Sequence, residues 1–235
     1  MKFTFKKLVL LCAITLFSGF VLQTTAQNKR ADDAARHANS AAKTFDEIMK
    51  IKDKGIPQSL LDKAEAVAVF PDVKKAGFIV GGKGGNGVIS RRVKGGWTEP
   101  AFYHIGGGSF GLQAGVESTD LVLLIMNNDG VNNLLKDKFE IGGEAGVAAG
   151  PVGRDTAAST DATLQAGILS YSRSKGAFAG VALKGSAITP DNDLNEAFYG
   201  KKAKDLLTES SPAKLASMPP QVQVFPRTLS GYSVK

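Results

Sequence analysis

The chain has almost none of the residues from which disulfide frameworks and zinc sites are built. It carries one cysteine, Cys12, and two histidines, His37 and His104, in 235 residues. A single cysteine cannot form an internal disulfide, and a structural zinc site needs four ligands, mostly Cys or His. We therefore expect the fold to be stabilised by packing, with no metal centre and no cofactor.

Acidic residues are absent from the first 26 positions. Three lysines precede an apolar run, Leu8–Leu22, and the small residues Thr24–Ala26 follow it. This pattern is typical of a secretory signal, and the run is short and interrupted for a membrane span. The sequence thus predicts cleavage near Ala26 and an exported protein, periplasmic or envelope-associated. A retained anchor and lipid attachment at Cys12 are the less favoured alternatives.

Removal of that segment leaves 209 residues and lowers the formal net charge from +7 to +4. This length is within the range of a single domain. The modest charge, with no interleaving of basic and aromatic residues, disfavours nucleic acid as a partner.

Helical periodicity is confined to the two ends of the remaining chain. Over residues 31–66, apolar residues recur at spacings of three and four. From Asp191 onward the pattern predicts a helix broken at Gly200, followed after Ser210 by a proline-rich segment with little periodicity. We expect a signal peptide over residues 1–26, one domain over 27–208, and a loosely ordered tail over 209–235.

The central zone, residues 67–188, is rich in glycine. Of the 27 glycines, 23 lie between Gly77 and Gly185, and the apolar runs between them are short and rich in β-branched or aromatic residues. Such runs favour a meander of antiparallel strands, with one helix near Val131–Lys136. The predicted fold class is α+β, with N-terminal helices packed on a glycine-rich antiparallel, barrel-like β-sheet, and a C-terminal helix and tail.

Three motifs in the sequence suggest enzymes or metal sites, and each lacks a required part. The glycines Gly82, Gly84 and Gly87 match a dinucleotide loop, but a β-branched run follows them where a helix is needed. We therefore expect a hairpin turn at Gly82–Gly87.

The segment Gly107–Gly111 matches a nucleophile elbow around Ser109, but both histidines precede that serine, and the hydrolase order needs a later base. The segment from Asp191 begins like a calcium loop, but Glu196 and Lys202 stand where Gly and Glu are needed. The sequence thus predicts a protein that is not an enzyme.

A series of motifs runs in order through the domain. The motifs lie in Ile56–Phe78, Gly81–Val88, Trp97–Phe102, Ser109–Gly115, Val147–Gly153, Tyr171–Gly180 and Asn195–Gly200. Together they resemble the SYLF lipid-binding domain, a family tied to yeast actin-patch proteins, over roughly residues 32–205. The resemblance implies a non-enzymatic domain that binds membrane lipids, phosphoinositides in the eukaryotic members. The signal-like segment points to a stand-alone, exported bacterial form.

An anionic headgroup would be attracted to clusters of basic residues, each worth roughly 1 kcal/mol near a charged surface. The partner that we expect is thus an anionic membrane lipid, contacted peripherally. A structural or partner-binding module without a lipid, and a carrier with an apolar cavity, remain open. Whether the N-terminal helix inserts in a membrane or packs in the core also remains open. The headgroup candidates are Lys83, Arg91, Arg92, Lys74, Lys75, Lys50 and Lys52.

Overall fold

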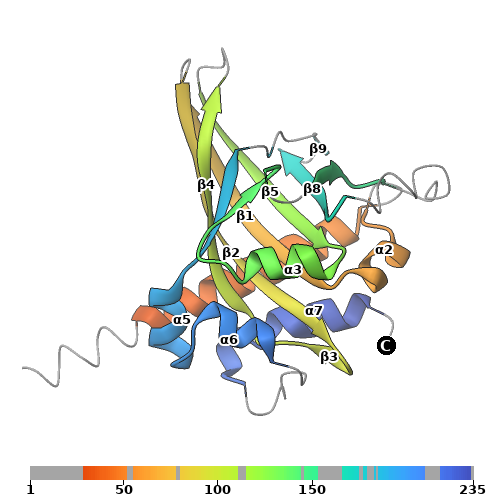
Figure 1. The fold of residues 1–235 in the computed structure, drawn as a ribbon, viewed down its shortest axis with the longest axis vertical. Helices are drawn as coiled ribbons and strands as arrows, with labels where there is room; N and C mark the ends of the chain where they lie inside the picture. Colours follow the sequence, from red (N-terminus) through yellow and green to blue (C-terminus); the bar gives the residue numbers. More distant parts are fainter. Residues whose placement is uncertain are drawn as a thin grey trace, which may run out of the picture.

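One β-sheet runs through the centre of the molecule, and helices lie on both of its faces (Figure 1). A computed structural model describes residues 29–51, 55–77, 80–110, 115–143, 146–152, 166–174, 177–178, 183, 185–209 and 218–233. The first helix spans residues 29–49 and is called the N-helix below. The other helices are α2 (Gln58–Lys63), α3 (Asn128–Leu134), α5 (Asn192–Tyr199), α6 (Ala203–Thr208), the 3-10 turn η1 (Pro220–Val222) and α7 (Val224–Tyr232). The strands are β1 (Ala66–Gly77), β2 (Val80–Val93), β3 (Gly96–Trp97), β4 (Ala101–Phe110), β5 (Gly115–Ile125), β6 (Phe139–Ile141), β7 (Val147–Ala149), β8 (Ile168–Ser174), β9 (Ala177–Phe178) and β10 (Ser186–Pro190).

The strands form a nearly closed, barrel-like sheet in the order β6-β10-β4-β2-β1-β5-β8-β7, which confirms the predicted fold class. The short strands β3 and β9 pair with β2 and β8. All described pairs are antiparallel except β7 with β8, which is parallel. The simple meander predicted from the sequence is wrong in its connections, because β5 pairs with β1 and β10 pairs with β4.

The N-helix and α7 cover one face of the sheet, which we call the N-helix face. Figure 1 shows the N-helix, in orange-red, crossing the sheet on the side opposite α3. Its buried residues recur every three or four positions and pack against β1, β5 and α7, as expected for an amphipathic core helix. The N-helix therefore packs in the core, which answers the question that the sequence left open. The buried stripe consists of Ala34, Ala38, Ala41, Phe45 and Ile48.

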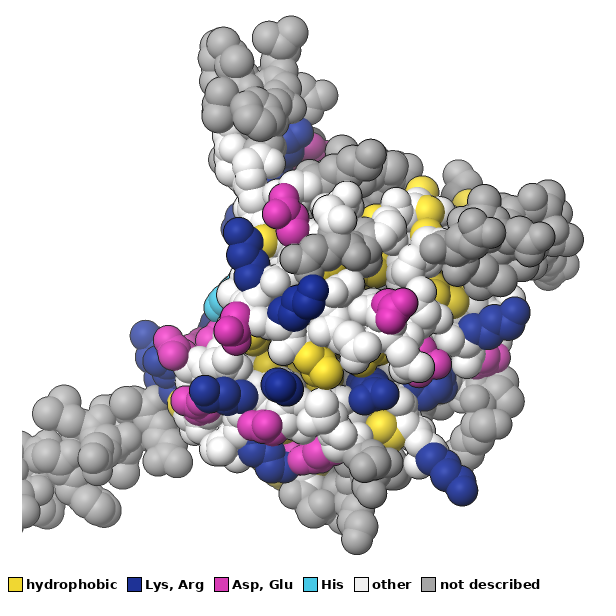
Figure 2. All heavy atoms as spheres, viewed as in Figure 1, with side chains coloured by type: hydrophobic (Ala, Val, Ile, Leu, Met, Phe, Trp, Pro, Cys, Tyr) yellow, Lys and Arg dark blue, Asp and Glu magenta, His cyan; other side chains and the backbone are white. Residues whose placement is uncertain are grey.

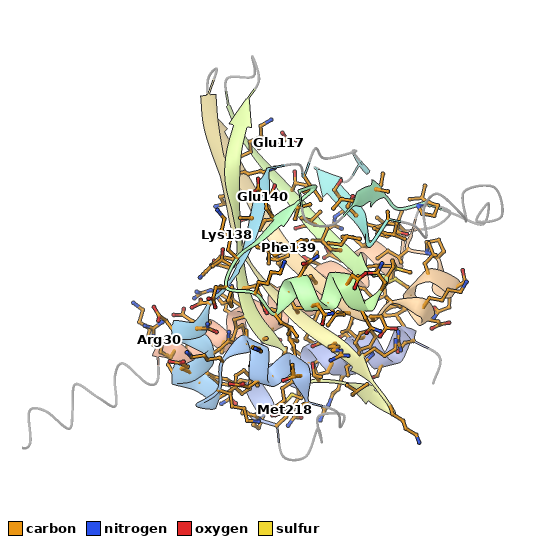
Figure 3. The ribbon with its side chains drawn as sticks, viewed as in Figure 1. Arg30, Glu117, Lys138, Phe139, Glu140 and Met218 are labelled. Carbon is orange, nitrogen blue, oxygen red and sulfur yellow. The ribbon has the colours of Figure 1, made fainter. Side chains whose placement is uncertain are left out.

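The opposite face of the sheet, which we call the α3 face, packs against α3 and α6. Alternation along the strands separates the two faces, so that Val67 and Val69 of β1 face the N-helix, whereas Ala68 and Phe70 face α3. Phe139 of β6, labelled near α3 in Figure 3, is fully buried in this cluster. The sheet is therefore a shared wall between two apolar clusters.

Helix α5 is fixed to β4 by a buried amide. The side chain of Asn195 accepts a hydrogen bond from the Phe102 amide at 2.9 Å and donates one to the Phe102 carbonyl at 3.0 Å. The helix ends at Gly200, whose φ of 69° is in the left-handed region that glycine adopts most readily. Helix α6 then follows, so the predicted break at Gly200 is confirmed.

Strand β1 contains a bulge at Pro71–Asp72. Five steps along β1 from Val69 to Lys74 match four steps along β2, so one extra residue is inserted. Asp72 adopts a φ of 53°, which is uncommon for a residue other than glycine. Its amide donates to the Asp120 carboxylate at 3.0 Å, and its own carboxylate accepts from the Ser118 hydroxyl. Side chains after the bulge therefore point to the opposite face of the sheet from the one that simple alternation would give.

Beyond the bulge the long strands project past the helices, at the upper end of Figure 1. Here β2 consists largely of glycine, and it pairs with β1 on one side and β4 on the other. The hairpin turn predicted at Gly82–Gly87 is therefore wrong, because these residues lie inside a fourteen-residue strand. The prediction failed because glycine signals a turn in isolation, whereas pairing on both sides supports an extended chain.

The loosely ordered tail predicted over residues 209–235 is also wrong for residues 218–233. They form η1 and α7, and Phe225 and Leu229 are fully buried in the core against the N-helix. The predicted helix near Val131–Lys136 is confirmed as α3, which is capped by the Asn127 side chain. The predicted signal segment lies outside the described residues.

Candidate anion-binding site

The predicted headgroup residues do not form one cluster. Lys50 lies at the end of the N-helix and pairs with Asp46 at 2.7 Å, and Lys52 lies outside the described residues. The face shown in Figure 2 carries basic and acidic side chains interspersed, rather than a single basic patch. The remaining five candidates lie in three places. Lys74 is on the N-helix face, Lys75 and Lys83 are on the α3 face, and Arg91 and Arg92 are at the other end of β2.

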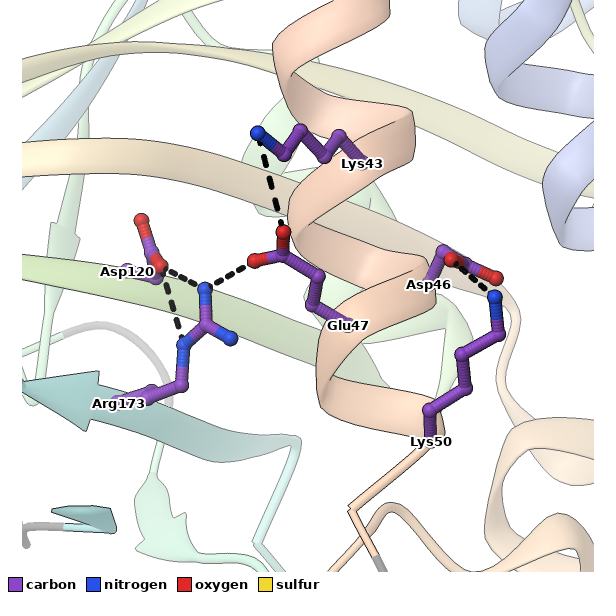
Figure 4. Close-up of polar contacts among 6 residues, drawn as sticks. All are labelled: Lys43, Asp46, Glu47, Lys50, Asp120 and Arg173. Carbon is purple, nitrogen blue, oxygen red and sulfur yellow. Dashed lines mark hydrogen bonds and ion pairs between the residues drawn. The ribbon is translucent and has the colours of Figure 1, made fainter. Parts of the chain in front are cut away.

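The polar side of the N-helix is largely neutralised by its own acids. Lys43 lies 3.9 Å from Glu47, and Arg36 lies 2.6 Å from Asp33. Figure 4 shows Arg173 of β8 joining Glu47 at 2.5 Å to Asp120 of β5 at 2.6 Å. The Arg173–Glu47 pair ties the helix to the sheet, and the pairs within the helix leave its surface without a continuous positive charge.

Arg91 and Arg92 face the carboxyl ends of two helices. Arg92 donates to the carbonyls of Ala64 at 2.9 Å and Leu61 at 2.7 Å, at the end of α2. Arg91 donates to the Leu207 carbonyl in the last turn of α6 at 3.3 Å. A cation at a helix carboxyl end is stabilised by the unpaired carbonyls and the helix dipole. Reversing both charges would therefore disturb the fold before it tested any lipid contact.

Lys75 and Lys83 are direct cross-strand neighbours on the α3 face, and Glu117 is the neighbour of Lys75 on its other side. Burial, and then the charge of Lys75, lowers the pKa of Lys83. Figure 3 places Glu117 near the glycine-rich end. This row of two cations and one anion lies across the sheet from Lys74.

Lys74 lies on the N-helix face because of the bulge. There it borders a hollow of about 370 Å³ between the N-helix and the glycine-rich strands. The bulge residues Pro71 and Asp72 form one wall, and the backbone of β2 forms the floor. We call this space the helix–bulge hollow. Its side chains with hydrogen-bonding capacity are Arg36, His37, Ser40, Asp72, Lys74 and Asn86, and its floor includes Gly84 and Gly85.

The two cations of the hollow are exposed and weakly held. The side chains of Arg36 and Lys74 are 64% and 66% exposed, and Lys74 lies 3.5 Å from the Asp72 carboxylate. Exposed pairs of this kind contribute little to stability, so either cation can exchange its partner for another anion at small cost. The Ser118 hydroxyl, followed by the charge of Lys74, lowers the pKa of Asp72, which favours its charged form.

Both histidines of the chain lie beside this hollow. His104 of β4 contacts Asn86 at 2.8 Å and Asp191 at 3.1 Å. The hydrogen bond that His104 donates to the Asp191 carboxylate raises the pKa of His104. Burial, and then the Arg36 charge, lowers the pKa of His37. Protonation of either imidazole would add positive charge near the hollow.

Ser109 of the nucleophile-elbow match and Asp191 of the calcium-loop match belong to a strand and to a helix cap. Ser109 lies within β4, and its backbone pairs with Gly81. Asp191 caps α5, where its carboxylate accepts from the Leu194 amide. Among the residues that the structure describes, no group of three or more His, Cys, Asp or Glu side chains is placed to hold a metal ion. Within the same ranges, no helix has the length and apolar character needed to span a bilayer.

Sequence reasoning named Lys74 but did not place Arg36, His37 or Asn86 beside it. Arg36 and His37 precede it by more than thirty positions, and Asn86 follows it by twelve. No spacing rule links them, since a helix packed on a sheet brings them together. The one available signal was local, because Pro71–Asp72 interrupts an apolar run with residues that favour bends.

Comparisons with known proteins give a consistent result. Residues 106–232 match a family described as "Ysc84: Las17-binding protein actin regulator". The chain is 39% identical over 152 residues to LAS seventeen-binding protein 3 of Saccharomyces cerevisiae, covering 63% of this chain and 33% of the relative. It is 34% identical over 184 residues to human SH3 domain-containing YSC84-like protein 1, covering 74% of this chain and 54% of the relative. The chain thus spans about a third to a half of the length of these relatives. Because the family match extends over more than half of the chain, the protein belongs to the Ysc84 (SYLF) family.

Proposed function

We propose that the protein binds the anionic headgroups of membrane lipids through the helix–bulge hollow. The observation that carries the proposal is that Arg36 of the N-helix and Lys74 of β1 line one hollow. A phosphate between them would accept hydrogen bonds from a guanidinium and an ammonium group, which are among the strongest that proteins make.

Neutral groups in the hollow suit the same ligand. Ser40 and Asn86 can donate hydrogen bonds to phosphate oxygens. A methyl group at Gly84 would meet only the Ile105 carbonyl oxygen, at 3.7 Å, so the absence of a side chain leaves the β2 backbone open to a ligand. Among the described residues that line the hollow, Asp72 is the one acidic side chain, and it would oppose an anion.

The proposed membrane contact is peripheral. The apolar stripe of the N-helix is buried against the sheet and is not available for insertion among acyl chains. Attraction would come from basic side chains, each worth roughly 1 kcal/mol near an anionic surface. We further propose, from the sequence pattern alone, that the protein is exported and acts at the cell envelope without enzymatic activity. The match to the SYLF family supports a lipid ligand.

Flotation with vesicles tests the proposal. The wild-type protein should float with phosphatidylglycerol vesicles more than with phosphatidylcholine vesicles, and added salt should weaken binding because it screens exposed charges. Lys74→Glu and Arg36→Glu should each weaken binding to anionic vesicles by about thirtyfold, since a reversed charge loses roughly 1 kcal/mol of attraction and adds as much repulsion. Asp72→Asn should strengthen it, and asparagine tolerates the positive φ at this position.

Lys43→Glu is the matched control. It makes the same charge change on the same helix, but Lys43 does not line the helix–bulge hollow. If Lys43→Glu weakens binding as much as Lys74→Glu, the hollow is not the site. If the wild type binds neutral and anionic vesicles equally, or neither, the electrostatic mechanism fails. The protein would then be an apolar carrier or a partner-binding module, the second being what the name of LAS seventeen-binding protein 3 says of that relative.

A further inference from the structure

A second hollow, of about 500 Å³, lies between the β2–β3 turn and the carboxyl end of α7. We propose that it binds a small zwitterion, with a carboxylate held by Arg92 and an ammonium group facing Asp62. This site is separate from the helix–bulge hollow and from the lipid function proposed above. Its lining includes Asp62, Arg92, Gly95, Gly96, Ser230 and Ser233.

Arg92 is held rigidly at the edge of this hollow. Its Nε and Nη2 atoms donate to the Ala64 and Leu61 carbonyls, and its guanidinium carbon lies 4.2 Å from the centre of the Trp97 ring. These contacts occupy the side edge of the guanidinium group and one of its faces. The end edge, formed by Nη1 and the second Nη2 hydrogen, makes no hydrogen bond to any residue in the described ranges.

The charge of Arg92 is not balanced by a direct ion pair. Its hydrogen-bond acceptors are neutral carbonyls, and within the described part of the chain no carboxylate lies within 4.0 Å of it. Burial lowers its pKa, and the charges of Asp62 and Glu65 act in the opposite direction without a direct contact. A carboxylate matches the two-pronged end of a guanidinium group and would pair with this cation directly.

Asp62 determines what else the ligand must carry. It lines the same hollow, so a ligand with only negative charge would be repelled there. A ligand with an ammonium group directed to Asp62 meets both charges. The Ser230 and Ser233 hydroxyls offer neutral hydrogen bonds, and the Ser233 hydroxyl already accepts from the Trp97 indole at 3.3 Å.

The size and the wall of the hollow suit a small molecule. Its volume is within the roughly 300–1,000 Å³ typical of small-molecule sites. Gly95 and Gly96, with φ of 90° and 155°, form a wall without side chains at the β2–β3 turn. An amino-acid-like zwitterion could therefore enter from this side and reach Arg92.

The single tryptophan of the chain gives a direct readout, because Trp97 is stacked on Arg92. Intrinsic fluorescence would be titrated with glycine, β-alanine and 4-aminobutanoate, which differ in the separation of their charges. Propionate lacks the ammonium group, and propylamine lacks the carboxylate. We expect a saturable change with at least one zwitterion and binding at least tenfold weaker with both single-charge probes, since a lost charged hydrogen bond costs about that factor.

Ser230→Leu is the decisive variant, because it places a larger apolar side chain in the lining of the hollow and leaves the Arg92 hydrogen bonds in place. It should abolish the saturable change without lowering the melting temperature. Gln221→Leu, an exposed position on η1 outside the hollow, should bind like the wild type. Asp62→Asn should bring the affinities for the zwitterion and propionate together.

The proposal is overturned if no zwitterion gives a saturable change, if Ser230→Leu responds like the wild type, or if propionate binds as tightly as the zwitterions. Ser230→Leu should still float with anionic vesicles, because Ser230 does not line the helix–bulge hollow. Failure here therefore leaves the lipid proposal untouched, and failure of flotation leaves this site untouched.

Discussion

The two ends of strand β2 have the same backbone pairing and different side-chain surroundings. At Val88–Ser90 the strand is fully buried, with the N-helix on one face and the α3 cluster on the other. At Gly82–Asn86 the residues are half-buried or exposed, although β1 and β4 pair with the strand on both sides. Burial stabilises the first end, and backbone pairing dominates the second. The open backbone at the second end is the floor of the helix–bulge hollow.

The largest expected effect comes from removing the cover of the buried end. Phe225 of α7 is fully buried in the cluster on the N-helix face. Phe225→Ala should lower the free energy of unfolding by about 3–5 kcal/mol, because it leaves a cavity in a packed core. Urea titration followed by circular dichroism measures this. A cost near zero would show that the C-terminal segment is a loose tail after all.

A smaller effect should separate the two ends within one strand. A methyl group at Gly87 would lie 2.2 Å from the Phe70 ring and 2.6 Å from the Val69 carbonyl, whereas one at Gly82 meets nothing within 4 Å. Gly87→Ala should therefore destabilise by about 1–3 kcal/mol, and Gly82→Ala should remain within about 0.5 kcal/mol of the wild type. The two urea midpoints make the comparison. Equal losses would mean that the glycines share one role, which the structure contradicts.

The smallest effect concerns the border between the two ends, where His104 pairs with Asp191. The raised pKa of His104 means that its contribution to stability is complete below the unfolded value, about 6.5, and is lost as pH rises through the folded value. The stability difference between wild type and His104→Gln should thus be larger near pH 5.5 than near pH 8. The histidine is about half exposed, so we expect a change below about 1 kcal/mol.

His37 works in the opposite direction, because its pKa is lowered, so it is left intact in both proteins of that comparison. Asp191, whose pKa is lowered first by its hydrogen bond with His104, loses its contribution only as pH falls below about 4. Urea midpoints at the two pH values decide the matter. A difference that is equal at both pH values, or larger near pH 8, would contradict the role given to the pair.

Local patterns in the sequence predicted the elements whose causes are local. The spacing of Ala34, Ala38 and Ala41 indicated the N-helix, and Gly200 marked the end of α5. Strand order could not be predicted in this way, because the pairing of β5 with β1 depends on residues far apart in the chain. Helix α7 was missed because Pro226 lies three residues into it, where proline is tolerated but where its presence suggests a loop.

The candidate site was predictable only in part. Lys74 was identified as basic and accessible, but the strand pattern alone could not show on which face it lies. Lys75, the next residue, was an equal candidate and lies across the sheet from the hollow. Arg92 was named for its charge, whereas its role at the end of α2 depends on a helix–strand contact. The sequence thus showed which residues are charged, but it could not show which groups each charge contacts.

The extra residue at Pro71–Asp72 reverses the face of the sheet to which each later side chain of β1 points. Deleting one residue there would restore simple alternation and exchange the positions of Lys74 and Lys75 relative to the sheet. Because both residues are lysines, one positive charge would remain on each face, and the change would fall on the wall that Pro71 and Asp72 form in the helix–bulge hollow. A single-codon deletion at this point could therefore reshape a binding surface while leaving every basic side chain in the protein.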